Sequence, residues 1–124
     1  YKEPADVAYQ DQADVNAAFL RLTRLLLEAG HYPAIATHDP ALIAQTRAHA
    51  QEKGISNDRF EFQMLYGIRR DLQRSLVNDG YRMRVYVPFG RQWFPYFMRR
   101  LGERPENVAF VVKSLLGEKK VGFF

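Results

Sequence analysis

The sequence predicts an α/β fold in which short parallel strands alternate with helices. Three times along the 124 residues, a helix-like stretch is followed by a glycine and then by a short apolar run. The runs are YPAIATH (32–38), FEFQML (60–65) and YRMRVYVP (81–88), and a fourth helix-like segment follows the last of them. Such regular alternation indicates parallel strands that are joined by right-handed crossovers.

The helices carry their own local signals. Apolar residues recur at helical spacing in DVNAAFLRLTRLLLEA (14–29). PALIAQTRAHAQEK (40–53) follows Asp39, a helix-capping residue type, and has Pro40 at the first helical position. A third helix is expected through Leu72, Leu76 and Val77. We expect the glycines that follow these helices to end them in the left-handed conformation: Gly30, Gly54 and Gly80.

Three strands are too few to complete either fold that this pattern fits, an open doubly wound sheet or part of a (β/α)₈ barrel. A barrel needs eight strands and about 250 residues, and a parallel sheet needs both of its faces covered. We therefore expect residues 1–124 to belong to a larger fold, and the first residues to be a loop that leaves a strand outside the sequence.

Composition excludes several classes of function. The chain has no cysteine, and its three histidines lack metal-ligand spacing, so no metal site is expected. It has no apolar run long enough to span a bilayer and no signal peptide, and we expect a cytoplasmic location. The net charge is +4, but basic residues are interspersed with acidic ones and no nucleic-acid-binding motif is present. We expect no nucleic-acid partner.

Polar side chains fall where sites gather in parallel α/β folds, at the carboxyl ends of the strands. Thr37, His38 and Asp39 follow the first run, and Tyr86 ends the third. Asp39 is better explained as a helix cap, His38 is equally well explained as a hydrogen-bonded loop residue, and Tyr86 could simply pack at the rim. Gln63 is harder to explain structurally, because an unpaired buried amide costs about 1–3 kcal/mol.

The segment WFPYFMRRLGERPEN (93–107) places adjacent arginines after an aromatic cluster. On a helix, four side chains would share one face: Tyr96, Arg99, Arg100 and Glu103. This face could be a solvated network of ion pairs. It could equally be a dry clamp, in which the guanidinium groups bind a small carboxylate or phosphate. The spacing of these residues is compatible with both the ion-pair network and the anion clamp.

Four motifs in order resemble those of the proline dehydrogenases, most closely the monofunctional bacterial enzymes. They are ATHDP (36–40), FEFQMLYG (60–67), YVPFG (86–90) and YxxRRxxE (96–103). The resemblance covers nearly the whole chain. It implies that residues 1–124 are the carboxyl-terminal portion of a distorted (β/α)₈ barrel, with about three parallel strands, incomplete on its own. It also implies FAD-dependent oxidation of L-proline to pyrroline-5-carboxylate, with a membrane quinone as the electron acceptor.

The resemblance assigns roles to particular residues. It implies that Arg99 and Arg100 bind the substrate carboxylate, while the walls around the pyrrolidine ring are Tyr86, Tyr96, Leu65 and Tyr1, the last matching the tyrosine of the family's KGAY motif. The residues at the cofactor site would be Thr37, His38, Gln63 and Glu103, the last also supporting the arginines.

The sequence departs from the family pattern in two respects. The earlier strands, which in the family carry a catalytic-site lysine, an acidic residue and a flavin-binding arginine, are absent, so no catalytic residue is expected within residues 1–124. We expect the isolated chain to be inactive and to need the amino-terminal half of the barrel as a partner. Gln12 also stands where close relatives usually have a lysine that contacts the cofactor.

Two other functions compete with the enzyme. One is a basic α/β interaction module that docks on a membrane surface or a protein through residues 93–98. This surface would also suit an enzyme that delivers electrons to a quinone, so peripheral membrane contact is compatible with both functions. The other is nucleic-acid binding. Aromatic side chains buried around a ligand would favour the enzyme, and exposed ones the interaction module.

Overall fold

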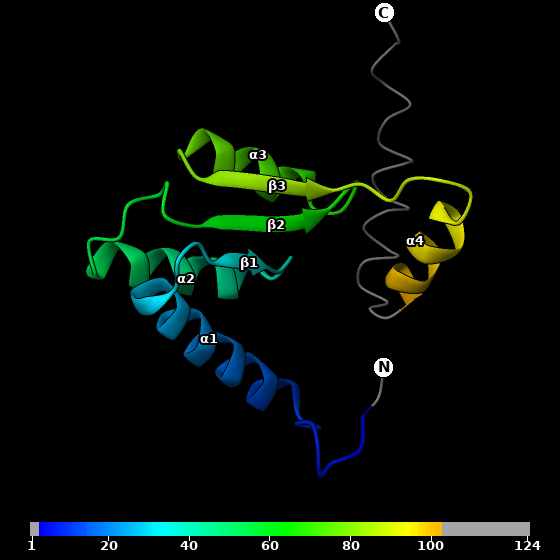
Figure 1. Cartoon of the computed structure of the whole chain (residues 1–124), viewed down its shortest axis with the longest axis horizontal. Coiled ribbons are helices and arrows are strands. Elements are labelled where there is room, and N and C mark those ends of the chain that lie inside the picture. The colour runs from blue at the N-terminus through cyan, green and yellow to red at the C-terminus, as the bar shows by residue number, and fades with distance from the viewer. Residues whose placement is uncertain (1–2, 103–124) are drawn as a thin grey trace, which may run out of the picture.

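The structure is a computed structural model that describes residues 3–102, with the backbone alone described for residues 97, 100, 101 and 102. Helices and strands alternate along the chain as the sequence predicts (Figure 1). The elements are α1 (Gln12–Ala29), β1 (Ala34–Ala36), α2 (Pro40–Glu52), β2 (Glu61–Leu65), α3 (Arg70–Asn78), β3 (Arg82–Tyr86) and α4 (Trp93–Gly102). None of the helices in this described part is long and apolar enough to cross a membrane.

The strands form one parallel sheet in the order β1-β2-β3. Ile35 pairs with Phe62, and Phe62 in turn pairs with Met83. Strands that are consecutive in the sequence are therefore neighbours in the sheet, as in a segment of a (β/α)₈ barrel. The predicted fold class, parallel strands with alternating helices, is confirmed.

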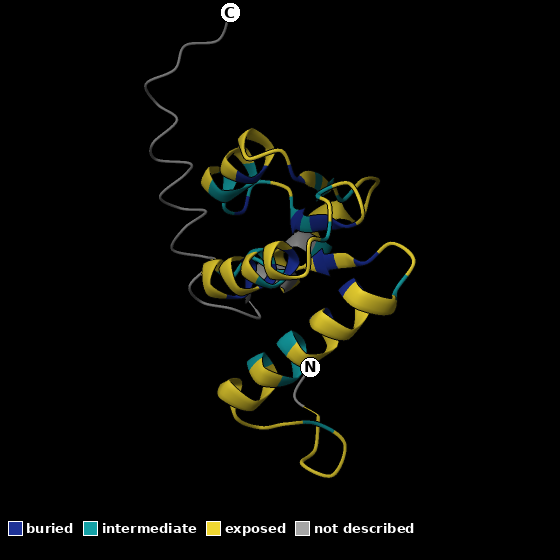
Figure 2. Cartoon of the chain, turned by 90° about the vertical axis from the view of Figure 1, so that its left-hand side faces the viewer, coloured by how far each residue is buried: buried dark blue, intermediate teal, exposed yellow. Residues whose placement is uncertain are grey.

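One face of the sheet is apolar and covered by helices. Strand residues Ile35, Phe62 and Met64 lie on it, and they share a buried cluster with Leu27 of α1, Ile43 of α2 and Leu76 of α3. The rings of Phe60, Phe62 and Tyr81 meet edge to face or tilted within this cluster. Figure 2 shows the buried residues concentrated between the helices and the sheet, while the outer side of α1 is exposed. Helices α1, α2 and α3 therefore all pack on the same face.

The opposite face of the sheet is largely polar. Because side chains alternate along a strand, the register places on this face Ala34, Ala36, Glu61, Gln63, Leu65, Arg82, Arg84 and Tyr86. On β3 all three of these side chains are exposed. A parallel sheet with helices on one face is compatible with a barrel segment, because in a barrel the helices form the outer ring and the other face of the sheet points inward.

Helix α2 begins as predicted. The side chain of Asp39 accepts hydrogen bonds from the backbone N–H groups of Ala41 and Leu42, at 2.7 and 3.3 Å, and Pro40 occupies the first helical position. This cap fixes the start of the helix immediately after the carboxyl end of β1.

The prediction of left-handed glycines is confirmed at two positions and wrong at the third. Gly54 and Gly80 have φ angles of +65° and +83°. Gly30 instead has φ −79° and an extended conformation. Its N–H donates to the carbonyl oxygen of Leu26 at 2.7 Å, and a Cβ atom at position 30 would lie only 2.4 Å from that oxygen. Position 30 requires glycine because the chain passes close to the Leu26 carbonyl oxygen, and not because the backbone has a positive φ there.

Candidate functional site

A pocket of about 230 Å³ lies where the carboxyl ends of the strands meet α4. It is lined by Ala36, His38, Gln63, Met64, Leu65, Tyr86 and Tyr96. Five of the residues that the sequence singles out therefore come together in one place: His38, Gln63, Leu65, Tyr86 and Tyr96. They arrive from three strand ends and one helix.

Two tyrosines connect β3 to α4 across the pocket. Their ring centroids lie 6.1 Å apart and the rings are tilted by 50°. Tyr86 is the last residue of β3, whereas Tyr96 lies in the first half of α4. The chain turns between them at Gly90, which has φ +94° and accepts a hydrogen bond from the N–H of Trp93. The pair provides an aromatic wall with phenol hydroxyls.

His38 takes the place of a strand residue at the end of β1. Its Nε2 atom accepts a hydrogen bond from the backbone N–H of Leu65 at 2.9 Å. A ring nitrogen that accepts carries no proton, so the imidazole is neutral and its proton lies on Nδ1. This contact explains why β1 ends earlier than the predicted run, because an imidazole and not a backbone carbonyl pairs with the end of β2.

Thr37 lies beside the pocket without lining it. Its Oγ1 atom accepts a hydrogen bond from the backbone N–H of Asp39 at 3.1 Å, and Asp39 caps α2. In the described structure both residues therefore shape the turn between β1 and α2. His49 joins α2 to α1 through a 2.8 Å contact with Glu28.

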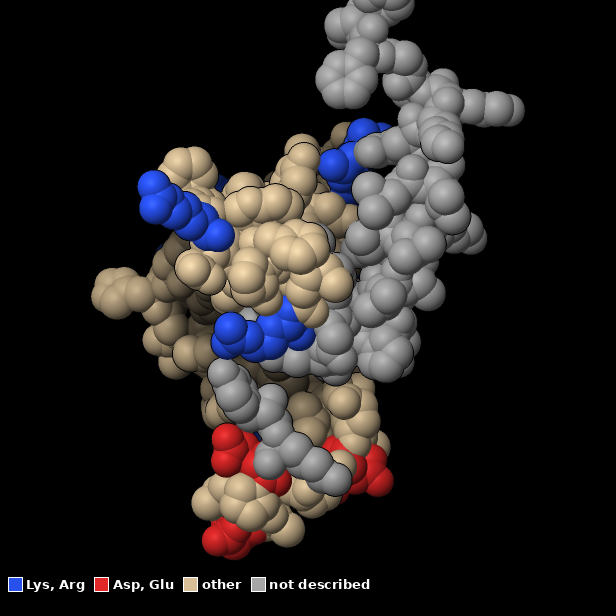
Figure 3. Space-filling view, turned by 90° about the vertical axis from the view of Figure 1, so that its right-hand side faces the viewer, with Lys and Arg blue, Asp and Glu red and all other residues tan. Residues whose placement is uncertain are grey.

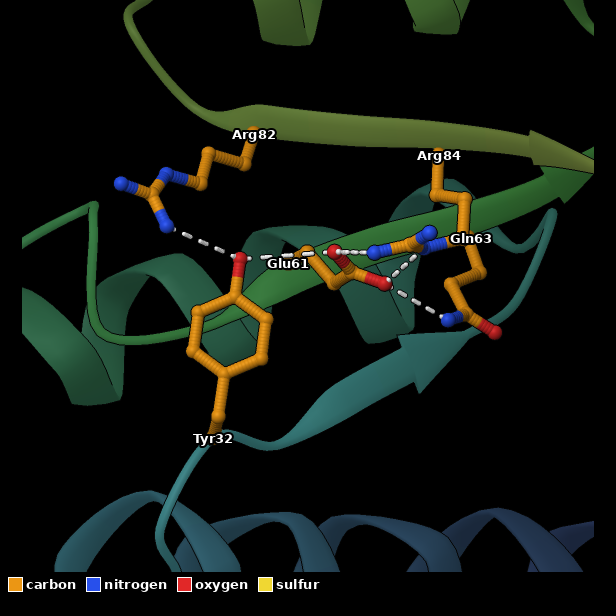
Figure 4. A network of polar contacts seen from close by, with 5 residues as sticks. All are labelled: Tyr32, Glu61, Gln63, Arg82 and Arg84. Atoms are coloured by element: carbon orange, nitrogen blue, oxygen red, sulfur yellow. Dashed lines mark hydrogen bonds and ion pairs between the residues drawn. The ribbon is translucent and has the colours of Figure 1, made fainter.

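A network of polar side chains surrounds Glu61 on the polar face of the sheet (Figure 4). The Glu61 carboxylate is buried, with 6% of the residue exposed. It accepts hydrogen bonds from Nε and Nη2 of Arg84 at 2.5 and 2.9 Å, and from Nε2 of Gln63 at 2.7 Å. The hydroxyl of Tyr32 lies 3.4 Å from the carboxylate and 3.3 Å from Nη1 of Arg82.

These contacts keep Glu61 ionised. The hydrogen bond from Arg84 has the largest effect and, with that from Gln63, lowers the pKa of Glu61 from 4.5 to about 2, although burial acts in the opposite direction. Neither Glu61 nor Arg84 is predicted from the sequence to be a site residue. The available signal is the alternation of polar and apolar residues, which puts Glu61 on the same side of its strand as Gln63, and Arg84 on the same side as Tyr86.

The structure does not bring Arg99 to the pocket. Arg99 lies on α4 three residues after Tyr96, and its side chain is exposed and is not among those that line the pocket. For Arg100 only the helical backbone is described, while Tyr1 and Glu103 lie outside the described residues. Gln12 begins α1 and donates a 2.8 Å hydrogen bond to Asn16. The arginine clamp stays a prediction.

The aromatic residues at the start of α4 are exposed. Trp93 and Phe94 each expose about half of their surface, and Phe89 in the preceding loop is 99% exposed. Figure 3, which views the side of the molecule where α4 lies, shows an uncharged surface with arginine or lysine side chains around it. Within residues 3–102, no group of three or more acidic, histidine or cysteine side chains is placed to hold a metal ion.

These features define a class of protein: a parallel α/β barrel segment with a site of aromatic, imidazole and amide groups at its strand ends. Comparison with known protein families supports this class. Residues 2–113 match the family described as proline dehydrogenase. The chain is 53% identical over 115 residues to proline dehydrogenase 2 of Bacillus subtilis (strain 168), and 53% identical over 116 residues to proline dehydrogenase of Deinococcus radiodurans.

The chain belongs to the proline dehydrogenase family. The two alignments cover 93% and 94% of this chain but only 38% and 37% of those relatives. Among solved structures, the chain resembles proline utilization A (PutA) from Bdellovibrio bacteriovorus inactivated by N-propargylglycine, with a TM-score of 0.71 and 34% identity. That match covers 76% of this chain and 10% of PutA.

Proposed function

We propose that this chain contributes the substrate side of a FAD-dependent enzyme that oxidises L-proline to pyrroline-5-carboxylate. The observation that carries the proposal is the pocket at the strand ends, in which Leu65, Tyr86 and Tyr96 form an apolar and aromatic wall. The wall adjoins the helix that carries Arg99 and Arg100. Such a site suits a small ring with an attached carboxylate.

The polar groups around the pocket fit a flavin. A flavin ring system has both N–H donors and carbonyl and ring-nitrogen acceptors. The sheet face offers a neutral imidazole at His38 and an amide at Gln63, and this mixed set can satisfy both kinds of group. When bound, FAD would supply the two-electron acceptor for the reaction, and a quinone would receive the electrons from it.

The residues of this chain would bind and orient the substrate. Arg99 and Arg100 would pair with the carboxylate through bidentate hydrogen bonds, which fix direction as well as position. Tyr86, Tyr96 and Leu65 would enclose the ring and exclude water. Glycine or alanine would leave this wall unfilled, which favours a cyclic substrate. Glu103 would hold the arginines in place, and Tyr1 would complete the wall.

The test is substitution of the arginines in the complete enzyme. Arg99→Met or Arg100→Met should raise the KM for proline by about tenfold to a hundredfold, because each removes charge-assisted hydrogen bonds to a carboxylate. Arg91→Met is the matched control, since Arg91 is an exposed arginine just before α4. A proline KM that stays at the parent value in both α4 variants would contradict the proposal.

A second candidate function is docking on a membrane surface or a partner, and the exposure of Trp93, Phe94 and Phe89 favours it. Docking would place a cytoplasmic enzyme close to a membrane quinone, so the two functions are compatible. The double variant Trp93→Ser/Phe94→Ser should bind less to anionic phospholipid vesicles and keep the proline KM. Unchanged vesicle binding would argue against docking through α4.

A further inference from the structure

The amide of Gln63 decides what the pocket offers to a ligand. A carboxamide has a carbonyl acceptor on one side and an N–H₂ donor on the other. The Nε2 atom of Gln63 donates to Glu61 at 2.7 Å, and in Figure 4 the amide oxygen lies on the side away from Glu61. Within the described chain, no side chain donates to that oxygen. Because Gln63 lines the pocket, this oxygen is the group of its side chain that is left to accept a hydrogen bond there.

Glu61 makes this orientation the favourable one. An ionised carboxylate can only accept hydrogen bonds, and Arg84 holds Glu61 in that state by donating to both of its oxygens. If the amide of Gln63 turned around, its carbonyl oxygen would face the Glu61 carboxylate and two acceptors would meet. The reversed amide would lose one hydrogen bond and gain a repulsion.

We propose that Glu61 is a positioning residue that holds the carbonyl oxygen of Gln63 toward the pocket, as the acceptor for an N–H group of the bound ligand. The inference rests on the proposed function. In that setting the N–H group belongs to the pyrimidine edge of the flavin or to the amine of proline. Both sources share the same chemistry, a polarised N–H donor, and the experiment separates them.

The structure provides matched variants for the test. Gln63→Met removes the acceptor and preserves side-chain length. Glu61→Gln removes the charge that orients the amide. Tyr32→Phe is the control, because it deletes another hydrogen bond to the Glu61 carboxylate, at 3.4 Å, without touching the contact with Gln63. Glu61→Met/Arg84→Met removes both charges together and leaves no buried charge unpaired.

The measurements are dissociation constants in the complete enzyme. FAD is titrated into the apoenzyme and followed by fluorescence. L-proline is compared with tetrahydrofuran-2-carboxylate, which has the same ring and carboxylate but an ether oxygen in place of the amine. Gln63→Met, Glu61→Gln and Glu61→Met/Arg84→Met should each raise the dissociation constant of the ligand that donates the N–H group, FAD or L-proline, by about threefold to tenfold. The double variant Glu61→Gln/Gln63→Met should bind no more weakly than Gln63→Met alone, and Tyr32→Phe should change the dissociation constants by less than about twofold.

The outcomes are distinct. Weaker binding of FAD, with proline and the ether analogue affected alike, assigns the N–H group to the flavin. Weaker binding of proline alone assigns it to the amine. The inference is overturned if Gln63→Met leaves all three dissociation constants unchanged, or if neither Glu61 variant weakens binding more than Tyr32→Phe does. It is also overturned if the losses of affinity from Glu61→Gln and Gln63→Met are additive in the combined variant. A parent enzyme that neither binds FAD nor oxidises proline would overturn the proposed function itself.

Discussion

Glu61 combines burial with charge on the face of the sheet that bears the pocket. Its carboxylate is stabilised by the guanidinium of Arg84 and the amide of Gln63, which hold its pKa at about 2. Arg84 itself is 65% exposed, so water screens the pair from one side and reduces its net stabilisation. This energy depends on the ionised form of the glutamate.

The free energy of unfolding should therefore depend on pH through Glu61. A glutamate with a lowered folded-state pKa stabilises the fold above its unfolded value of 4.5, and this contribution is lost as the pH falls toward 2. The stability difference between the parent and Glu61→Gln should shrink from pH 5 to pH 3 in urea titrations. Glu52→Gln, at an exposed position of α2, serves as the control. Parallel curves for the parent and Glu61→Gln down to pH 3 would contradict this expectation.

The residues of the pocket were predictable because the carboxyl ends of parallel strands meet at one edge. His38, Gln63 and Tyr86 each follow from that rule once the strands are located. Glu61 and Arg84 do not, because their contact depends on the register between β2 and β3. That register pairs Gln63 with Arg84 and leaves Glu61 diagonal to the arginine, and no local pattern specifies it.

Element ends show the same division between local and tertiary causes. The start of α2 follows from Asp39 and Pro40, since the cap and the first helical position involve neighbouring residues. The end of α1 does not, because Gly30 lies between the carbonyl oxygen of Leu26 and the ring of Pro33. The close contact arises from the direction in which the chain leaves α1 toward β1, and this direction is set by packing of the helix on the sheet.

Substitution of glycines should separate these two causes. Gly30→Ala should destabilise the fold by about 1–3 kcal/mol, because the new methyl group would meet a backbone oxygen at 2.4 Å that cannot move without α1. Gly54→Ala has open space around it but must adopt φ +65°, which costs about 1–2 kcal/mol. Asparagine distinguishes them in thermal unfolding: it tolerates the left-handed conformation and should cost less than alanine at position 54, whereas at position 30 its Cβ atom meets the same backbone oxygen. A Gly30→Ala protein as stable as the parent would refute the close-approach explanation.

At the scale of the whole molecule, the sheet has helices packed on one face within the described residues 3–102. Helices α1, α2 and α3 pack on the apolar face, whereas the polar face carries the exposed side chains of Arg82, Arg84 and Tyr86. In the described part of the chain, β1 and β3 each pair with β2 alone. Both of these edges are suited to further parallel strands, as in a closed barrel.

The isolated chain of 124 residues should therefore neither retain FAD nor oxidise proline. A flavin on the polar face would contact one sector of the barrel and remain open to water elsewhere, and an open site loses the dry environment in which the arginines bind a carboxylate strongly. Visible absorbance after gel filtration and proline-dependent dye reduction measure the two properties, with the complete enzyme as the positive control. Adding the remaining strands as a separate polypeptide should restore both if the two parts assemble. Sustained turnover by the isolated chain would show that three strands suffice, and would contradict the role of a barrel segment.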